Sequence, residues 1–72
     1  MRKVYRIEVD CANCANKMEL AAGKIAGVAF VSVNYMTQKM TLEYAPEADI
    51  QAVQQAVEKA CRKIDSDFSI SW

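Results

Sequence analysis

A change of hydrophobic period marks residues 9–18, VDCANCANKM. Upstream of it, apolar and polar residues alternate through Val4–Val9, which is the pattern of a half-buried strand. From Cys14 to about Ile25, apolar residues recur at intervals of three and four, which is the period of a helix with one buried stripe. A strand therefore leads into a helix at two cysteines, Cys11 and Cys14, that are separated by two residues.

Two strands and a turn are expected in the middle of the chain. Gly27 is the expected end of the first helix, because glycine is common just after helices. Residues 28–34 are rich in β-branched side chains and residues 39–44 alternate polar and apolar, and both patterns are typical of strands. The four residues 35–38 between them predict a hairpin turn, although they lack the Asn-Gly pair that favours the tightest turns.

A second helix and a final strand complete the chain. Pro46 interrupts the preceding strand, and Asp49 is a suitable N-cap because its carboxylate can accept a hydrogen bond from a free backbone N–H. Phe68, Ile70 and Trp72 alternate with polar residues, which predicts a last strand. The apolar stripe of the second helix consists of Ile50, Val53, Val57, Cys61 and Ile64.

The predicted order of elements is βαββαβ. Residues 1–72 are enough for one domain with a small core. The simplest packing is the ferredoxin-like arrangement of α+β proteins, one four-stranded antiparallel sheet with both helices on one face. Polar side chains that alternate with the buried ones, such as Arg6 and Thr41, then lie on a sheet face that meets water.

Composition excludes several classes of function. Nine basic and nine acidic side chains give a net charge of zero, whereas nucleic-acid binders usually carry a basic surplus. No apolar run approaches the roughly 18 residues of a membrane span, and the N-terminus alternates too quickly for a signal peptide. We therefore expect a cytoplasmic monomer with no nucleic-acid partner and no direct contact with a membrane. In a reducing compartment, a close cysteine pair more often binds metal or does redox chemistry than forms a structural disulfide.

The start of a helix is a suitable place for metal-binding thiols. Free backbone N–H groups and the helix dipole stabilise thiolates there, so we expect lowered pKa values for both Cys11 and Cys14. Thiolates are ligands for soft and borderline metal ions. The chain has no histidine, so a further ligand must supply sulfur or oxygen. Asp10 either supplies that oxygen or only places a favourable negative charge beside the helix start.

Further residues are expected near the pair, because the topology places the 35–38 turn and the end of the second helix at the same end of the sheet. Arg62 or Lys63 could then offset the negative charge of a metal bound by two thiolates. Cys61 is either a third ligand or a core residue. Its place on the apolar stripe favours the core.

These features resemble the heavy-metal-associated domain, a small ferredoxin-like module that occurs in metallochaperones and as an N-terminal domain of metal-transporting P-type ATPases. The resemblance covers essentially the whole chain, and it implies that Cys11 and Cys14 are the metal ligands. In zinc-type members the acidic residue before the first cysteine can also ligate the metal, which implies Asp10 here. Three segments resemble the zinc/cadmium/lead branch: residues 10–15 (DCANCA), 33–40 (VNYMTQKM) and 63–67 (KIDSD).

The resemblance implies a metal carrier that has no catalytic role. It binds Zn(II), Cd(II) or Pb(II) and passes the ion to a transporter membrane domain or to a metal-exchange partner protein. Zinc accepts oxygen beside sulfur, whereas Cu(I) is satisfied by two thiolates. A free-standing Cu(I) metallochaperone is the alternative. Residues 8–9 are Glu-Val where many members have Gly-Met, and residues 61–63 are Cys-Arg-Lys where copper-type members often have Gly-Tyr or Gly-Phe, and both departures weaken the copper hypothesis.

Two other functions share parts of this pattern. A glutaredoxin-like thiol-disulfide oxidoreductase also uses strand–CxxC–helix, but such folds typically hold a cis-proline beside the disulfide, and Pro46 is expected at the far end of the sheet. An RNA-recognition module shares βαββαβ but needs aromatic residues on the open sheet face, where this sequence places mostly charged and polar ones. Both are therefore disfavoured.

Overall fold

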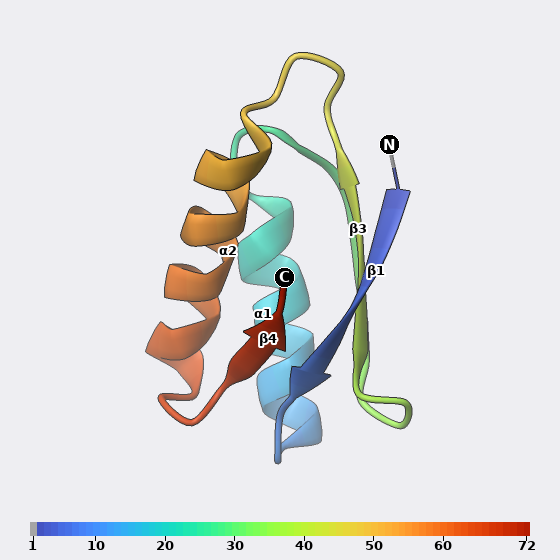
Figure 1. Cartoon of the computed structure of the whole chain (residues 1–72). Coiled ribbons are helices and arrows are strands. Elements are labelled where there is room, and N and C mark those ends of the chain that lie inside the picture. The colour runs from blue at the N-terminus through green and yellow to red at the C-terminus, as the bar shows by residue number, and fades with distance from the viewer. Residues whose placement is uncertain (1) are drawn as a thin grey trace.

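A computed structural model describes residues 2–72 and contains six regular elements in the order β1–α1–β2–β3–α2–β4 (Figure 1). Their order is the one that the sequence predicts. Their bounds are β1 Arg2–Glu8, α1 Ala12–Gly23, β2 Val28–Asn34, β3 Lys39–Tyr44, α2 Ile50–Ile64 and β4 Ser69–Ser71.

The four strands form one antiparallel sheet in the order β2-β3-β1-β4, and both helices cover the same face of it (Figure 1). This arrangement confirms the ferredoxin-like α+β fold. It brings the end of β1, the β2–β3 turn and the end of α2 to one end of the molecule. That end also holds the start of α1, so the topology gathers three connections there: β1–α1 with the cysteine pair, β2–β3 and α2–β4.

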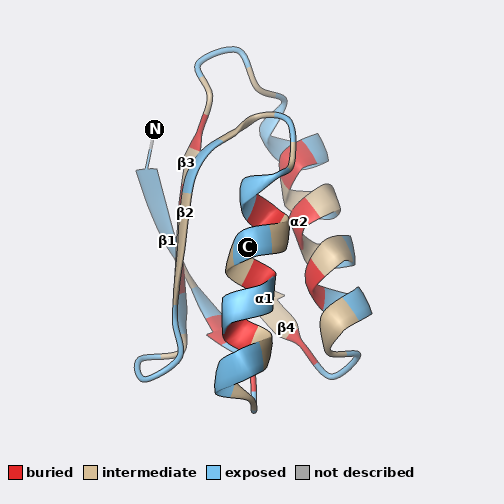
Figure 2. Cartoon of the chain, turned by 180° about the vertical axis from the view of Figure 1, so that it is seen from behind, coloured by how far each residue is buried: buried red, intermediate tan, exposed pale blue. Residues whose placement is uncertain are grey.

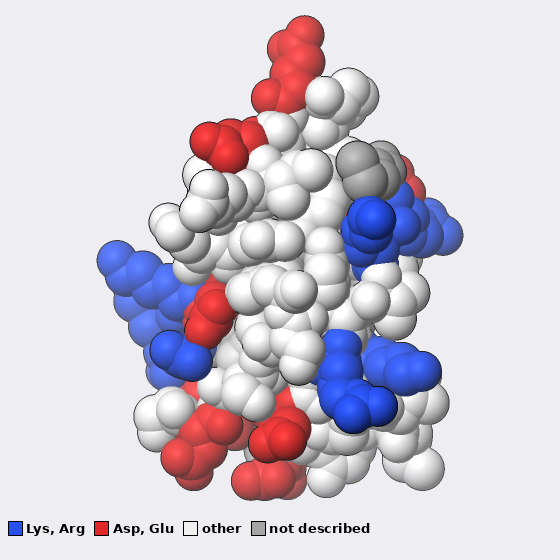
Figure 3. Space-filling model, viewed as in Figure 1, with Lys and Arg blue, Asp and Glu red and all other residues white. Residues whose placement is uncertain are grey.

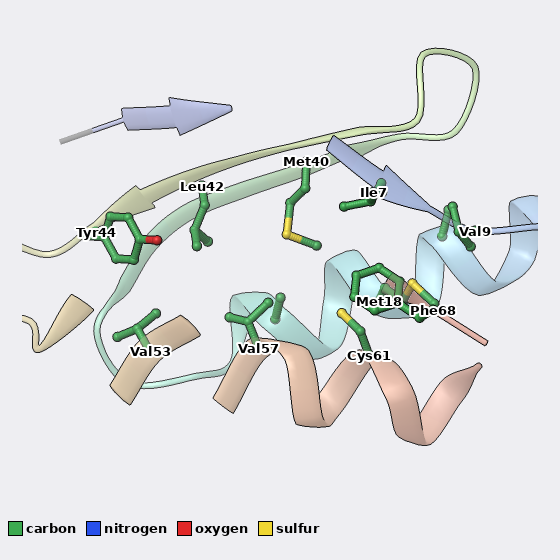
Figure 4. Packing of buried hydrophobic residues seen from close by; sticks show 12 residues of the cluster. Ile7, Val9, Met18, Met40, Leu42, Tyr44, Val53, Val57, Cys61 and Phe68 are labelled. Carbon is green, nitrogen blue, oxygen red and sulfur yellow. The ribbon is translucent and has the colours of Figure 1, made fainter. Parts of the chain in front are cut away.

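The core lies between the sheet and the two helices, and Figure 2 shows the buried residues on the helix surfaces that face the sheet. Alternation along β3 is complete, because Met40, Leu42 and Tyr44 are buried while their neighbours are not. The close view in Figure 4 shows these side chains meeting those of the helices. The largest fully buried side chains are Phe68, Ile7, Met18, Met40, Leu42, Val57 and Cys61.

Helix α2 begins as the sequence predicts. Asp49 is its N-cap, and the carboxylate accepts a hydrogen bond from the backbone N–H of Ala52 at 3.3 Å. The first stripe residue, Ile50, remains 37% exposed, whereas the three that follow on the stripe are buried: Val53, Val57 and Cys61. Within residues 2–72, neither α1 nor α2 has the length and apolar character that a membrane crossing requires.

Helix α1 ends earlier than the sequence predicts. The apolar period extends to Ile25, but the helix ends at Gly23 and Lys24 is its C-cap. Gly27 does not stop the helix and instead lies in the turn before β2, with a φ of +95°. A Cβ at this position would lie 2.6 Å from Cγ2 of Val53. Glycine is therefore required here by both the left-handed backbone and the close approach of α2.

The last strand is shorter than predicted, and Trp72 lies beyond it. β4 spans Ser69–Ser71 and pairs with the final residues of β1. The Trp72 ring packs edge-on against the Tyr5 ring, with 4.8 Å between centroids, and its indole N–H donates to a Glu58 carboxylate oxygen at 2.8 Å. Trp72 therefore joins the short strand to both β1 and α2.

Candidate metal centre

The cysteine pair lies where β1 leads into α1. Cys11 is the N-cap of the helix, with φ −136° and ψ 123°, and its sulfur accepts a hydrogen bond from the backbone N–H of Cys14 at 3.2 Å. The sequence predicts a helix from Cys14, but α1 begins at Ala12 because the sulfur takes the place that a side-chain oxygen has in most N-caps. Both thiols therefore share one helix start, and both are partly exposed.

The two thiols differ in acidity. A hydrogen bond from the Cys14 thiol, together with the backbone N–H of Cys14, lowers the pKa of Cys11. The same hydrogen bond raises the pKa of Cys14, because its thiol is the donor and a nearby thiolate disfavours a second negative charge. The charge of Asp65 adds to this increase in pKa. The expectation of two lowered pKa values is therefore confirmed for Cys11 and wrong for Cys14.

The β2–β3 turn holds the segment before the cysteines. The backbone N–H of Ile7 donates to the Gln38 carbonyl at 3.0 Å, and the N–H of Val9 donates to Oε1 of Gln38 at 2.8 Å. The Tyr35 hydroxyl donates to the Asp10 carbonyl at 3.3 Å. The turn therefore lies at the cysteine end, as the topology predicts. Gln38 is the positioning residue that sequence reasoning missed, since a glutamine in a turn carries no pattern of its own.

Asp10 lies immediately before Cys11 and is exposed. Its backbone carbonyl takes part in the contact with the turn. Within residues 2–72, no three side chains of the Cys, Asp and Glu types are gathered as a site with three protein ligands would need. The structure thus brings Cys11 and Cys14 together without adding a third ligand, and the role of Asp10 in metal binding stays a prediction.

Cys61 is a core residue. It has no exposed surface, and its side chain points into the layer between α2 and the sheet, toward Met18 and Phe68 (Figure 4). Burial raises the pKa of the Cys61 thiol to about 12, so the side chain is neutral under ordinary conditions. This bears out the expectation of core packing.

The cation that influences the pair comes from α1. The charge of Lys17, one turn beyond the cysteines, lowers the pKa of both thiols. The sequence suggested Arg62 or Lys63 for this role. Arg62 instead forms an ion pair with Glu58 at 2.8 Å and donates to the Phe68 carbonyl at 3.4 Å, while Lys63 is exposed at the end of α2. The spacing of Lys17 three residues after Cys14 on one helix was the available signal.

Comparison with known proteins also indicates a domain that is associated with heavy metals. A family model described as the heavy-metal-associated domain matches residues 4–63. Over 57 residues the chain is 42% identical to a copper-exporting P-type ATPase of Bacillus subtilis (strain 168), covering 78% of this chain and 7% of that protein. Over 53 residues it is 43% identical to a zinc/cadmium/lead-transporting P-type ATPase of Shigella sonnei (strain Ss046), covering 72% of this chain and 7% of that protein. The chain thus spans a small fraction of the length of these relatives.

The fold is also found in a solved structure with related sequence. The N-terminal domain of a potential copper-translocating P-type ATPase from Bacillus subtilis, in its Cu(I)-loaded state, superposes with a TM-score of 0.73 at 32% identity. The match covers 97% of this chain and 82% of that one. Because the family model spans most of the chain and the strand–CxxC–helix element lies within it, this chain belongs to the heavy-metal-associated domain family.

Proposed function

We propose that this domain binds one heavy-metal ion between Cys11 and Cys14 and passes it to a partner protein. The observation that carries the proposal is the meeting of the two thiols at one helix start, where the Cys14 N–H already supports negative charge on the Cys11 sulfur. The domain holds its cargo and does no bond-making chemistry on it.

The difference in acidity between the thiols suggests an order of events. Cys11, with its lowered pKa, supplies a thiolate to the incoming ion first. Cys14 then loses its proton as the ion binds, because a bound cation removes the repulsion that raises its pKa. Both side chains are partly exposed, so a partner's thiolate can reach the ion before either cysteine releases it.

Cu(I) is the cargo with the most support from relatives. The copper-exporting ATPase relative and the Cu(I)-loaded solved domain are both named for copper. Two soft thiolates satisfy Cu(I) without a further protein ligand, and Cys11 and Cys14 are the two thiols that lie together.

A divalent ion is the second candidate, and the sequence alone placed it first. The zinc/cadmium/lead-transporting relative has 43% identity over 53 residues, against 42% over 57 residues for the copper-exporting one. Asp10 stands directly before Cys11, so its carboxylate could supply the oxygen that Zn(II) or Cd(II) accepts beside sulfur. Pb(II) belongs to the same candidate set.

The proposed partner is the membrane domain of a metal-transporting P-type ATPase in the same chain, or a metal-exchange protein that docks on the cysteine end. A cytoplasmic, reducing location fits this role because it keeps both thiols free. We propose that the domain acts as a monomer, since one pair of thiols is a complete transfer site. A free-standing carrier with the same site is the alternative to a transporter domain.

Competitive metal titration tests both the site and its cargo. The fully reduced protein is titrated with Cu(I), Zn(II) and Cd(II) against chelators of known affinity. We expect the Cys11→Ser and Cys14→Ser variants to lose tight binding of every ion. If both variants bind all three ions as the wild type does, the proposed function is wrong.

Asp10→Asn then separates the two candidate cargoes, with Asp67→Asn as the matched control because Asp67 is an exposed aspartate in the α2–β4 connection. If Asp10 is a ligand, only Asp10→Asn weakens Zn(II) and Cd(II) binding, by roughly tenfold or about 1.4 kcal/mol, and Cu(I) binding is unchanged. If the two variants behave equally and Cu(I) forms the only well-defined complex, Asp10 is a surface charge and Cu(I) is the cargo.

A further inference from the structure

The sheet face that no helix covers holds two like charges directly opposite each other. In the pairing of β1 with β3, Arg6 lies opposite Lys39, and both side chains are exposed. Like charges in facing positions on neighbouring strands destabilise a sheet. The ion pairs within residues 2–72 are Arg2–Glu43 and Arg62–Glu58, so neither Arg6 nor Lys39 has an acidic partner there.

These two cations are the centre of a polar row that crosses the whole sheet. Ser71 of β4 lies opposite Arg6, and Asn34 of β2 lies opposite Lys39. All four positions alternate with inward-facing residues such as Ile7 and Met40, which places the row on the open face. A chain lying across the strands would therefore meet hydrogen-bonding side chains on all four of them.

On the open face of the described strands, neither acidic residue, Glu8 or Glu43, forms an ion pair with Arg6 or Lys39. Glu43 is held by Arg2 at 3.2 Å, and Glu8 lies two positions along β1 from Arg6. Val4, between the two arginines, is 60% exposed. In Figure 3, Lys and Arg side chains lie on the sheet side of the molecule and also on the α2 side, while most Asp and Glu side chains lie toward its two ends.

We propose that this open face docks an acidic segment of a partner protein, whose carboxylates contact Arg6 and Lys39 while an apolar side chain covers Val4. Carboxylates on the two cations would remove the like-charge repulsion that the isolated sheet carries. An exposed valine beside charged residues gives such a segment an apolar contact as well.

An acidic polypeptide fits this face better than RNA does. The one aromatic residue among the paired positions of the open face, Phe30, has Arg2 over its ring at 4.9 Å, so the ring is not free for stacking on a base. A polypeptide needs no aromatic ring to stack on, so carboxylates that contact Arg6 and Lys39 fit this face without one.

The position of the face has a consequence for metal exchange. Both helices, including α1 with its cysteine pair, lie on the opposite side of the sheet (Figure 1). A segment on the open face would leave Cys11 and Cys14 accessible. The domain could therefore be held by a partner while its ion is exchanged.

Chemical-shift mapping on the 15N-labelled full chain tests the proposal. The probe is a short synthetic peptide of alternating Glu and Val, and its counterpart with Gln for Glu is the neutral control. We expect the acidic peptide to shift amide signals of β1 and β3, and the shifts to shrink at high salt because exposed charges are screened. The neutral peptide should leave these signals in place.

A pair of double variants makes the test specific. Arg6→Gln with Lys39→Gln removes the two cations, and Lys59→Gln with Lys63→Gln makes the same charge change on the outer surface of α2. We expect the first to raise the Kd for the acidic peptide roughly five- to tenfold and the second to leave it nearly unchanged. Equal weakening in both variants, or no binding to the wild type, would overturn the proposal.

Two further measurements distinguish an acidic polypeptide from RNA and from an effect of the metal site. A uridine oligonucleotide that shifts the same β1 and β3 signals more strongly than the peptide would also overturn it, in favour of RNA. The Cys11→Ser Cys14→Ser double variant should bind the peptide as the wild type does, so the result is independent of the metal proposal. Spectra of each variant that retain the wild-type pattern outside the substituted strands confirm that it is folded.

Discussion

The backbone N–H of Cys14 donates a hydrogen bond to the sulfur of Cys11 over 3.2 Å. The contact makes one cysteine the N-cap of the helix that carries the other. It also makes the two thiols unequal, because the pKa of Cys11 falls while that of Cys14 rises. An incoming metal ion would thus meet two thiols, of which Cys11 loses its proton more readily than Cys14.

Alkylation should report this inequality. Near neutral pH, we expect iodoacetamide to modify Cys11 first, because a lowered pKa gives it the larger thiolate fraction. At the same pH, Cys14 should react more slowly than Cys11, because its pKa is raised. Cys61 should stay unmodified in the folded protein, since it is fully buried. Mass spectrometry of peptides over a pH series measures all three; faster modification of Cys14 than of Cys11 would contradict the assignment.

Cys61 should make the stability depend on pH in the alkaline range. Its pKa rises from 9.0 to about 12 on folding, so the folded state keeps the proton more tightly than the unfolded state. The resulting stabilisation is complete below pH 9.0 and decreases as the pH rises toward about 12. Cys61→Ala lacks this group, so its free energy of unfolding should fall less steeply over that interval. Urea unfolding followed by Trp72 fluorescence gives both curves, and parallel curves would show that Cys61 does not titrate in this way.

Gln38 should support both the fold and the metal loop. Gln38→Ala removes the acceptor of the Val9 N–H and the donor to the Tyr35 carbonyl, which are at 2.8 and 2.7 Å. We expect a loss of about 1–3 kcal/mol in the free energy of unfolding and weaker metal binding, because the segment before Cys11 is no longer held. Gln51→Ala, an exposed glutamine of α2, is the matched control. A loss of stability with unchanged metal affinity would limit Gln38 to a structural role.

The two glycines should respond oppositely to alanine. Gly27→Ala places a Cβ 2.6 Å from Val53 at a φ of +95°, so we expect a loss of roughly 2–4 kcal/mol in the free energy of unfolding. Gly23→Ala meets only an ordinary contact, 3.6 Å from Cγ1 of Val31, in the last turn of α1. It should be neutral or stabilise by up to about 1 kcal/mol. Thermal unfolding of the two variants decides this, and similar midpoints would contradict the strain at Gly27.

The alternation and helical period of apolar residues predicted most of the fold, because these patterns follow directly from which side chains are buried. β2 and β3 have the predicted bounds, and Asp49 caps α2 as expected, since strand alternation and capping act over a few neighbouring residues. The errors lie at element ends. Ile25 continues the helical period but packs from a turn, and β4 ends before Trp72 although the alternation continues. Close to both places the chain contacts another element, Gly27 against Val53 and Trp72 against Tyr5, and the local period does not reveal such contacts.

Hydrophobic period and residue spacing are local properties of the chain, and they were enough to predict the order of the elements and the place of the cysteine pair between β1 and α1. The surroundings of that pair and the side chains on the open sheet face follow from the packing of distant segments. Gln38 reaches Val9, and Arg6 faces Lys39, across long separations in sequence. Such contacts depend on strand register and turn geometry, and single polar side chains carry no periodic signal that reveals them.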